Sequence, residues 1–218
     1  AGERAHFGRS REILAGEGYA VASLDYRLLP EHPFPAAVHD VRCAVRYLRS
    51  EAADLGIDGD RIMAAGGSAG GHLAALLGYA SRADAFDDRG AFAPAADERC
   101  PHDASAAVQG VVAYYGVFDL TDRAEFSRWT RGAVDRFLGA PASADPARAR
   151  AASPASYVAA SARSSGADAP SGAGPSSLPP TLLVHGDADA VVPIAQSRDL
   201  AIALGAAEAP VTLVELER

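Results

Sequence analysis

A serine between two glycines is the residue of this chain best suited to nucleophilic chemistry. Ser68 follows Gly66 by two residues and precedes Gly70 by two. A short apolar run comes before it and an apolar helical pattern after it, which predicts a strand turning directly into a helix. Glycines at both positions remove Cβ atoms that would collide in so sharp a bend. The Ser68 hydroxyl would then rise above the sheet beside the amide of Ala69, where a helix N-terminus favours developing negative charge.

A flexible glycine turn is the alternative explanation of this pattern. The strand before Ser68, the helix after it and the additional Gly71, which lets helix and sheet pack closely, favour the nucleophile.

A second reactive group is expected near residues 185–193. Asp187 and Asp189 follow a predicted strand over residues 181–184. In a parallel sheet, functional side chains gather beyond the carboxyl ends of the strands, which is where Ser68 also lies. An acid there could hold the base that a serine nucleophile needs, and either aspartate could fill that role or simply form the turn.

Composition limits the classes of function. The chain has 218 residues, of which 49% are hydrophobic, so we expect one domain over residues 1–218. Its net charge of −8 argues against a nucleic-acid or anionic-membrane partner, and no apolar run reaches transmembrane length. Cys43 and Cys100 lack metal-ligand spacing, so neither a metal nor another cofactor is expected. Cys43 falls in a predicted helix, where we expect a buried thiol and no disulfide.

Helical and strand patterns alternate along the chain and predict an α/β fold, a mostly parallel sheet flanked by helices. Strands are expected over residues 19–26, 61–65, 108–115, 181–184 and 211–216. Helices are expected over residues 7–15, from 36 to about 55, from 73, over 126–138 and from 194. Residues 81–107 read as a surface excursion, and residues 161–180, rich in Ser, Gly, Ala and Pro, as a flexible loop. Residues 117–160 could form a lid over the site or an ordinary packing helix.

Three segments together resemble the α/β-hydrolase superfamily, within the esterase/lipase group that includes hormone-sensitive-lipase-like and feruloyl-esterase-like (BD-FAE) enzymes. They are residues 25–35 with Asp40, residues 66–74 around the serine, and residues 185–193. The resemblance implies a serine hydrolase that cleaves small carboxylic esters through an acyl-enzyme. It implies Ser68 as nucleophile, Ala69 as an oxyanion donor and Asp189, three residues before Val192, as the triad acid. Val192 is expected to contact substrate.

The family pattern also predicts features that these residues lack. Its His-Gly-Gly-Gly oxyanion loop would precede residue 1, and its catalytic histidine would follow the strand at 211–216. We therefore expect a hydrolase fold incomplete at both ends, and 218 residues that are inactive alone. None of the six histidines is expected to replace the base. His185 should orient the acid loop by hydrogen bonding, and the other five should be structural or exposed.

Several further residues keep two interpretations. Arg27 and Asp40 are expected to form an ion pair that pins the connection before the first long helix, with substrate recognition by Arg27 as the alternative. Tyr114, Tyr115 and Phe118 could line the acyl pocket or belong to the core, and we expect Tyr115 to contact substrate.

Other activities remain open. Arylformamidase or S9-type peptidase activity could use the same groups, and a catalytically dead binding module would follow if the native chain ended at Arg218. A cytoplasmic location is expected, although a signal peptide could precede residue 1. The oligomeric state is not predicted.

Overall fold

Four parallel strands form a single sheet in the order β1-β2-β3-β4. The structure is a computed structural model that describes residues 8–80, 86, 92, 100–101, 103–122, 124, 126–164 and 178–217. The strands are Met63–Gly67 (β1), Gly110–Tyr114 (β2), Thr181–Gly186 (β3) and Val211–Leu216 (β4). Because all three neighbouring pairs are parallel, the carboxyl ends of the strands lie at one edge, and the predicted parallel sheet is confirmed.

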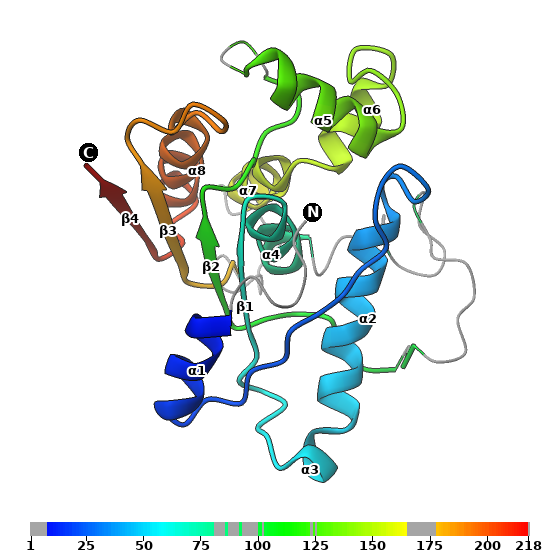
Figure 1. Ribbon diagram of the computed structural model, residues 1–218, viewed down its shortest axis with the longest axis vertical. Helices are drawn as coiled ribbons and strands as arrows, with labels where there is room; N and C mark the ends of the chain where they lie inside the picture. Colours follow the sequence, from blue (N-terminus) through cyan, green and yellow to red (C-terminus); the bar gives the residue numbers. More distant parts are fainter. Residues whose placement is uncertain are drawn as a thin grey trace.

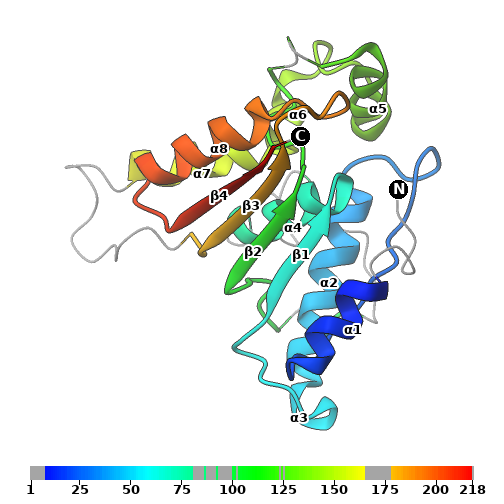
Figure 2. The ribbon, with the colours of Figure 1, turned by 60° about the vertical axis from the view of Figure 1, so that its left-hand side comes forward.

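Helices cover one face of this sheet (Figures 1 and 2). Helix α4 (Ala69–Tyr79) packs on β1 and β2, and α8 (Ala195–Ala206) packs on β3 and β4. Helix α7 (Pro154–Ser164) contacts both of them, and α2 (Ala36–Ser50) packs against α4. Each of these helices connects to a parallel strand, which is the arrangement typical of an α/β fold.

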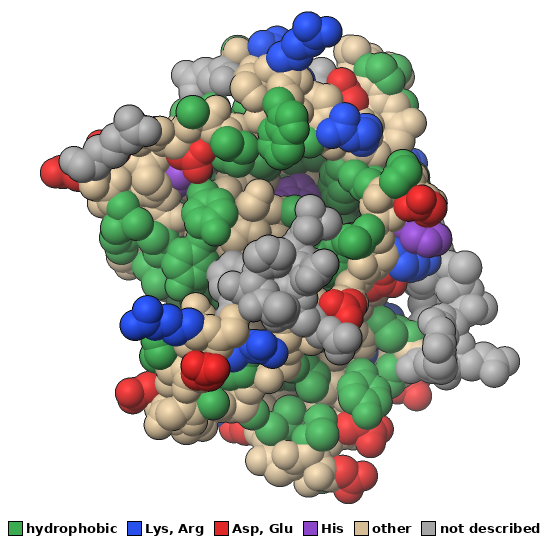
Figure 3. All heavy atoms as spheres, viewed as in Figure 1, with side chains coloured by type: hydrophobic (Ala, Val, Ile, Leu, Met, Phe, Trp, Pro, Cys, Tyr) green, Lys and Arg blue, Asp and Glu red, His purple; other side chains and the backbone are tan. Residues whose placement is uncertain are grey.

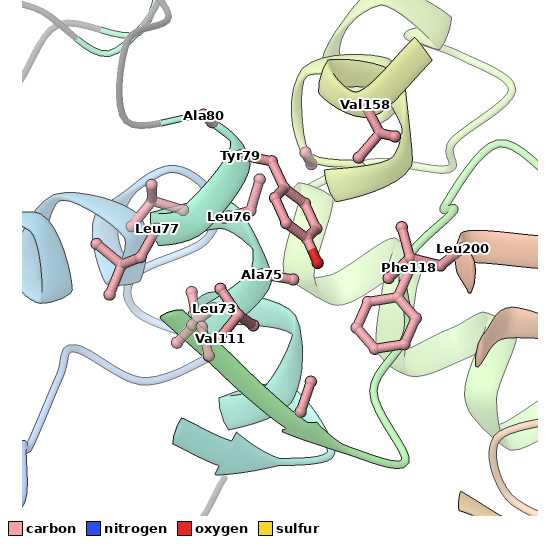
Figure 4. Close-up of a cluster of buried hydrophobic side chains, with 14 of the residues drawn as sticks. Leu73, Ala75, Leu76, Leu77, Tyr79, Ala80, Val111, Phe118, Val158 and Leu200 are labelled. Carbon is pink, nitrogen blue, oxygen red and sulfur yellow. The ribbon is translucent and has the colours of Figure 1, made fainter. Parts of the chain in front are cut away.

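Helix α4 is the centre of the core. Every residue from Gly71 to Tyr79 is buried, and Figure 4 shows Leu73, Leu76 and Tyr79 of α4 among side chains from the neighbouring elements. A Cβ at Gly78 would collide with the side chain of Val111 on β2, so glycine lets α4 lie close against the sheet. Such close packing is what fixes the start of α4 relative to the ends of the strands.

The remaining helices lie at the periphery. They are α1 (Gly8–Gly16), α3 (Ala52–Leu55), α5 (Arg128–Leu138) and α6 (Pro146–Ala151). Helices α5 and α6 lie beyond the carboxyl ends of the strands (Figure 1), within the expected lid segment of residues 117–160. That segment also includes most of α7, which belongs to the helical layer on the sheet.

The opposite face of the sheet carries exposed apolar side chains. Val214 and Leu216 of β4 point away from α8, and hydrophobic side chains gather over the strands in Figure 3.

The strand expected over residues 19–26 is wrong. These residues form no strand, and Tyr19 is 58% exposed. A run of β-forming residues becomes a strand only when a neighbouring strand accepts and donates its backbone hydrogen bonds. No strand in the described sheet pairs with this segment, because β1 pairs only with β2.

The ion pair predicted between Arg27 and Asp40 is confirmed. The Arg27 guanidinium lies 2.8 Å from Asp40 Oδ1, and the Arg27 backbone N–H donates to Asp40 Oδ2 at 2.7 Å. The same guanidinium donates to the carbonyl of Ala36 at 3.2 Å, at the start of α2. The connection is therefore tied to α2 by side-chain bonds in place of strand pairing.

The prediction that Cys43 is an unpaired thiol is also wrong. Cys43 forms a disulfide with Cys100, with 5.3 Å between their Cα atoms. The two cysteines lie 57 residues apart, so only the tertiary fold reveals that α2 meets the segment at residue 100. Most of the predicted surface excursion, residues 81–107, lies outside the described residues, but Phe86 within it is buried against Phe34.

The predicted loop at residues 161–180 lies mostly outside the described residues, and its first four residues continue α7. Within the described part of the chain, no helix is both long and apolar enough to cross a bilayer.

Candidate active site

Ser68 occupies a strained turn between β1 and α4. Its φ of 53° and ψ of −119° fall in a region that side-chain-bearing residues rarely adopt. The Ser68 N–H donates to the carbonyl of Tyr114 at the end of β2, at 2.9 Å, and the Ser68 carbonyl accepts from the His72 N–H at 3.0 Å. The surrounding strand and helix thus hold the strained residue in place while the residue itself remains exposed.

The two glycines of the turn have different roles. A Cβ at Gly66 would lie 2.5 Å from the carbonyl carbon and oxygen of Gly70, a distance that the backbone cannot accept without moving. A Cβ at Gly70 would meet nothing within 4 Å. The expectation of a collision is therefore correct for Gly66 and wrong for Gly70. Gly71, where a Cβ would lie 3.1 Å from the carbonyl oxygens of Gly66 and Tyr114, is the second tight position.

Ala69 is the first residue of α4. Amides in the first turn of a helix have no acceptor within the helix, so the Ala69 N–H, next to Ser68, is left without a helical partner.

Asp189 lies in the turn after β3 and is held by its own loop. Its Oδ1 accepts from the N–H groups of Val191 and Val192, at 2.7 and 3.0 Å. The Oδ2 atom lies 3.6 Å from Nε2 of His185. The rival Asp187 is exposed, and its backbone N–H extends the pairing with β4 by donating to Leu216 at 3.1 Å. Asp189 is thus the better oriented of the two carboxylates.

His185 holds the acid loop by hydrogen bonding, as predicted. Its ring is fully buried, with Nε2 at 2.9 Å from the Val192 carbonyl and Nδ1 at 2.7 Å from Oγ of Ser197. A carbonyl oxygen only accepts, so Nε2 carries the proton and the Ser197 hydroxyl donates to Nδ1. Both ring nitrogens are therefore occupied, which leaves none for a catalytic proton transfer.

The other described histidines are equally unsuited to act as the base. His72 lies one turn into α4, where it is 5% exposed and binds the Val117 carbonyl through Nδ1 at 2.7 Å. Burial lowers its pKa to about 4, partly offset by that hydrogen bond. Burial also lowers the pKa of His39. His32 is exposed, and within the described residues no hydrogen bond joins it to Ser68 or Asp189. His6 and His102 lie outside the described residues.

The strand order sets the spacing between the two candidate catalytic groups. Ser68 follows β1 and Asp189 follows β3, with β2 between them. Two strand steps correspond to about 10 Å. An imidazole hydrogen-bonded on both sides spans roughly 8 Å between its partners, which is similar to the spacing of these strand ends. The described residues contain no such free imidazole.

The expected substrate contacts fall in different environments. Tyr115 follows β2 with a φ of 40° and is 41% exposed, between the ends of β1 and β3. Phe118 is buried beside Leu200 (Figure 4), so it is a core aromatic residue, and Tyr114 is half-buried. The side chain of Val192 is buried as well, and its backbone binds Asp189 and His185.

Three polar side chains of the site had no signal in the sequence. Ser197 binds His185, Thr130 of α5 donates to the Val191 carbonyl at 2.6 Å, and Gln196 accepts from the backbone after β2. Isolated Ser, Thr and Gln residues fall in no motif, and only the packing of distant segments brings them to the strand ends. In the described part of the chain, no group of His, Cys, Asp and Glu could hold a metal ion.

A parallel sheet with a serine elbow after one strand and a fixed carboxylate two strands away defines an α/β-hydrolase. The chain belongs to the BD-FAE family, whose model matches residues 3–166. It is 34% identical to the esterase LipQ of Mycobacterium tuberculosis over 201 residues, which cover 91% of this chain and 41% of LipQ. It is 31% identical to the esterase LipC of the same organism, covering 85% of this chain and 40% of LipC.

A solved structure gives the same fold. Esterase 2 of Thermogutta terrifontis, in its propionate-bound form, matches with a TM-score of 0.71 and 29% identity, over 100% of this chain and 67% of that one. The chain thus spans about two fifths of the length of these two mycobacterial relatives and two thirds of the esterase 2 structure.

Proposed function

We propose that the whole protein hydrolyses carboxylic esters through an acyl-enzyme formed on Ser68. The observation that carries this proposal is the strained elbow at Ser68, two strands away from a carboxylate fixed by two backbone amides. Similarity to proteins named as esterases supports the reaction class.

In this proposal the Ser68 hydroxyl attacks the ester carbonyl while a base takes its proton. The carbonyl oxygen becomes an oxyanion that accepts from the Ala69 N–H. The protonated base then gives its proton to the alcohol, which leaves, and water repeats the sequence on the acyl-Ser68 ester to release the acid. The proposed base is a histidine outside the described residues, held in one tautomer by Asp189. His72 and His185 are buried and bonded to other groups, His39 is half-buried, and no hydrogen bond in the described part of the chain joins the exposed His32 to Ser68 or Asp189.

Esters of short acyl chains are the proposed substrates. Esterase 2 of Thermogutta terrifontis has been solved with propionate and with butyrate bound, which supports a short acyl group in a related site. Tyr115, exposed at the end of the middle strand, is the proposed contact. Val192, also expected to contact substrate, has a buried side chain and is proposed to act through its backbone N–H, which holds Asp189.

Residues 117–160 are proposed to cover the site. The hydrogen bond from Thr130 to Val191 joins α5 to the acid loop, so the position of α5 depends on that loop.

The test is hydrolysis of p-nitrophenyl acetate, butyrate and octanoate by the full-length protein and by its Ser68→Ala variant. We expect Ser68→Ala to lower kcat by about 10⁴-fold or more, since a serine triad acts as a unit. Ser50→Ala is the matched control, because Ser50 is exposed at the end of α2 and should leave kcat unchanged. Full activity in Ser68→Ala would disprove the nucleophile assignment. A formyl-anilide assayed alongside distinguishes esterase from arylformamidase activity.

The cellular location remains a prediction. The cytoplasm was expected, but a Cys43–Cys100 disulfide favours an oxidising compartment. Thiol alkylation of the protein in cell fractions would decide between the two: rapid alkylation without reductant indicates the cytoplasm.

A further inference from the structure

One peptide bond in the loop after β2 is held at both of its polar ends by buried side chains. The carbonyl of Val117 accepts from Nδ1 of His72 at 2.7 Å. The N–H of the same peptide, on Phe118, donates to Oε1 of Gln196 at 2.8 Å. That oxygen also accepts from the Asp119 N–H at 2.8 Å. We refer to His72, the Val117–Phe118 peptide and Gln196 as the bridge.

The bridge begins on the element that carries the candidate nucleophile. His72 lies on α4 four residues after Ser68, and its backbone N–H donates to the Ser68 carbonyl at 3.0 Å. The His72 side chain is 5% exposed and its ring packs edge-on against Phe137 of α5, with 5.3 Å between ring centroids. A displacement of Val117 is therefore transmitted to the first turn of α4.

The bridge ends on the element behind the candidate acid. Gln196, 9% exposed, lies in the first turn of α8 beside Ser197, which binds His185. His185 in turn holds the Val192 carbonyl, and the Val192 N–H holds Asp189. Between the two ends, the ring of Phe118 is buried beside Leu200 of α8 (Figure 4), so the bridged peptide is anchored in the core.

We propose that His72 and Gln196 are positioning residues. Their hydrogen bonds to the two polar ends of a single peptide bond set the spacing between Ser68 and Asp189. This inference rests on the proposed hydrolase function of the same site. Neither side chain touches the reacting atoms. Displacements of about 1 Å between catalytic groups cost on the order of 100-fold in rate. Loss of the bridge should therefore lower kcat.

Matched pairs of variants in the full-length protein test the bridge. Gln196→Glu keeps an acceptor oxygen at the same length, whereas Gln196→Met keeps the length and removes the acceptor. His72→Asn keeps an N–H donor near the position of Nδ1, whereas His72→Leu removes it. With p-nitrophenyl butyrate we expect the Met and Leu variants to lose about 10- to 100-fold in kcat with KM within about 3-fold. The Glu and Asn variants should retain kcat within about 3-fold of the parent.

The double variant His72→Leu/Gln196→Met supplies a second readout. Because both side chains act on one peptide, the loss of kcat in the double variant should fall well short of the product of the single losses. Losses that multiply in full would overturn the bridge, as would Met and Leu variants with unchanged kcat.

Folding and function are separated by two controls. Each assay is run well below the melting temperature of each variant, and if the Met or Leu variant does not fold, the Glu and Asn variants decide. A loss above about 10-fold in a folded Glu or Asn variant contradicts the bridge, because the hydrogen bonds are retained there. Ser68→Ala tests the parent hypothesis independently: if it stays active, the hydrolase proposal fails, whereas if it is inactive and the bridge variants are normal, only the bridge fails.

Discussion

The elbow at Ser68 and the loop at Asp189 lie at the same edge of the sheet but are held by different means. The elbow is fixed by backbone: a strained φ at Ser68, two backbone hydrogen bonds, and contact between Gly66 and Gly70 so close that no Cβ fits. The acid loop is fixed by side chains, with the Asp189 carboxylate on two amides and His185 beneath it.

This difference determines which substitutions should disrupt each region. The elbow has no space for a Cβ at Gly66 and little at Gly71, so it should be sensitive to added side-chain volume at these two positions. The acid loop is held by donors and acceptors that each have a partner, several of them buried, so it should be sensitive to the loss of a single partner.

The largest effect is expected at Gly66. In Gly66→Ala the added Cβ meets the backbone of Gly70, which belongs to α4 and cannot move without shifting Ser68. We expect a loss of about 3 kcal/mol in the free energy of unfolding and about 100-fold in kcat. Gly70→Ala is the control for stability, because its Cβ meets open space and alanine favours a helix by about 0.5–1 kcal/mol. Thermal unfolding of both variants measures the contrast, and equal losses would contradict the steric account.

Acid should lower the free energy of unfolding through His72 on helix α4. The folded-state pKa of His72 is lowered by burial to about 4 from a usual value of 6.5, so the unfolded state binds the proton more readily. Stability from this group is present above pH 6.5 and is lost as the pH falls toward 4, amounting to about 3 kcal/mol in full.

Urea unfolding between pH 7 and pH 4 measures this loss. In the His72→Asn variant, residue 72 no longer titrates. The free energy of unfolding of the variant should therefore fall less steeply over the same pH range than that of the parent protein. Parallel curves for the two proteins would show that His72 is not the group responsible.

A smaller effect is expected when the acid loop loses one hydroxyl. Ser197→Ala removes the donor to Nδ1 of a fully buried histidine and leaves that nitrogen unsatisfied. The expected cost is about 2 kcal/mol of unfolding free energy. Ser197→Thr, which retains the hydroxyl, is the control, although its methyl group must also be accommodated. If Ser197→Ala is as stable as the parent, side-chain pairing does not hold the loop.

The smallest effect is expected outside both regions, at Arg27. Its ion pair with Asp40 is partly exposed, with 47% of the Arg27 side chain accessible. Arg27→Ala should cost about 1 kcal/mol and leave the preference among p-nitrophenyl esters unchanged. A change of substrate preference without loss of stability would instead indicate that Arg27 recognises substrate.

The same contrast explains what the sequence could predict. The elbow was recognisable because its constraints are local: the glycines around Ser68 and the apolar runs on both sides together signal them. The four strands and helices α2, α4, α5 and α8 were predictable for a similar reason, since each carries its own periodic pattern. Helices α6 and α7 were not predicted as separate elements.

Features that depend on distant segments were not predictable. The Cys43–Cys100 disulfide, the Ser197 and Gln196 contacts and the buried Phe86 all join parts of the chain that no local pattern connects. Residues 19–26 failed as a strand for the complementary reason: their composition favours β structure, but a strand needs a neighbour to pair with.

The most direct test of the account is the identity of the residue that forms the covalent adduct. The full-length protein would be treated with a fluorophosphonate, digested and analysed by peptide mass spectrometry. The account predicts that loss of ester hydrolysis tracks one phosphonyl group on Ser68, and that Ser68→Ala takes up none. An adduct on another residue in an inactivated protein, or undiminished labelling of Ser68→Ala, would contradict it.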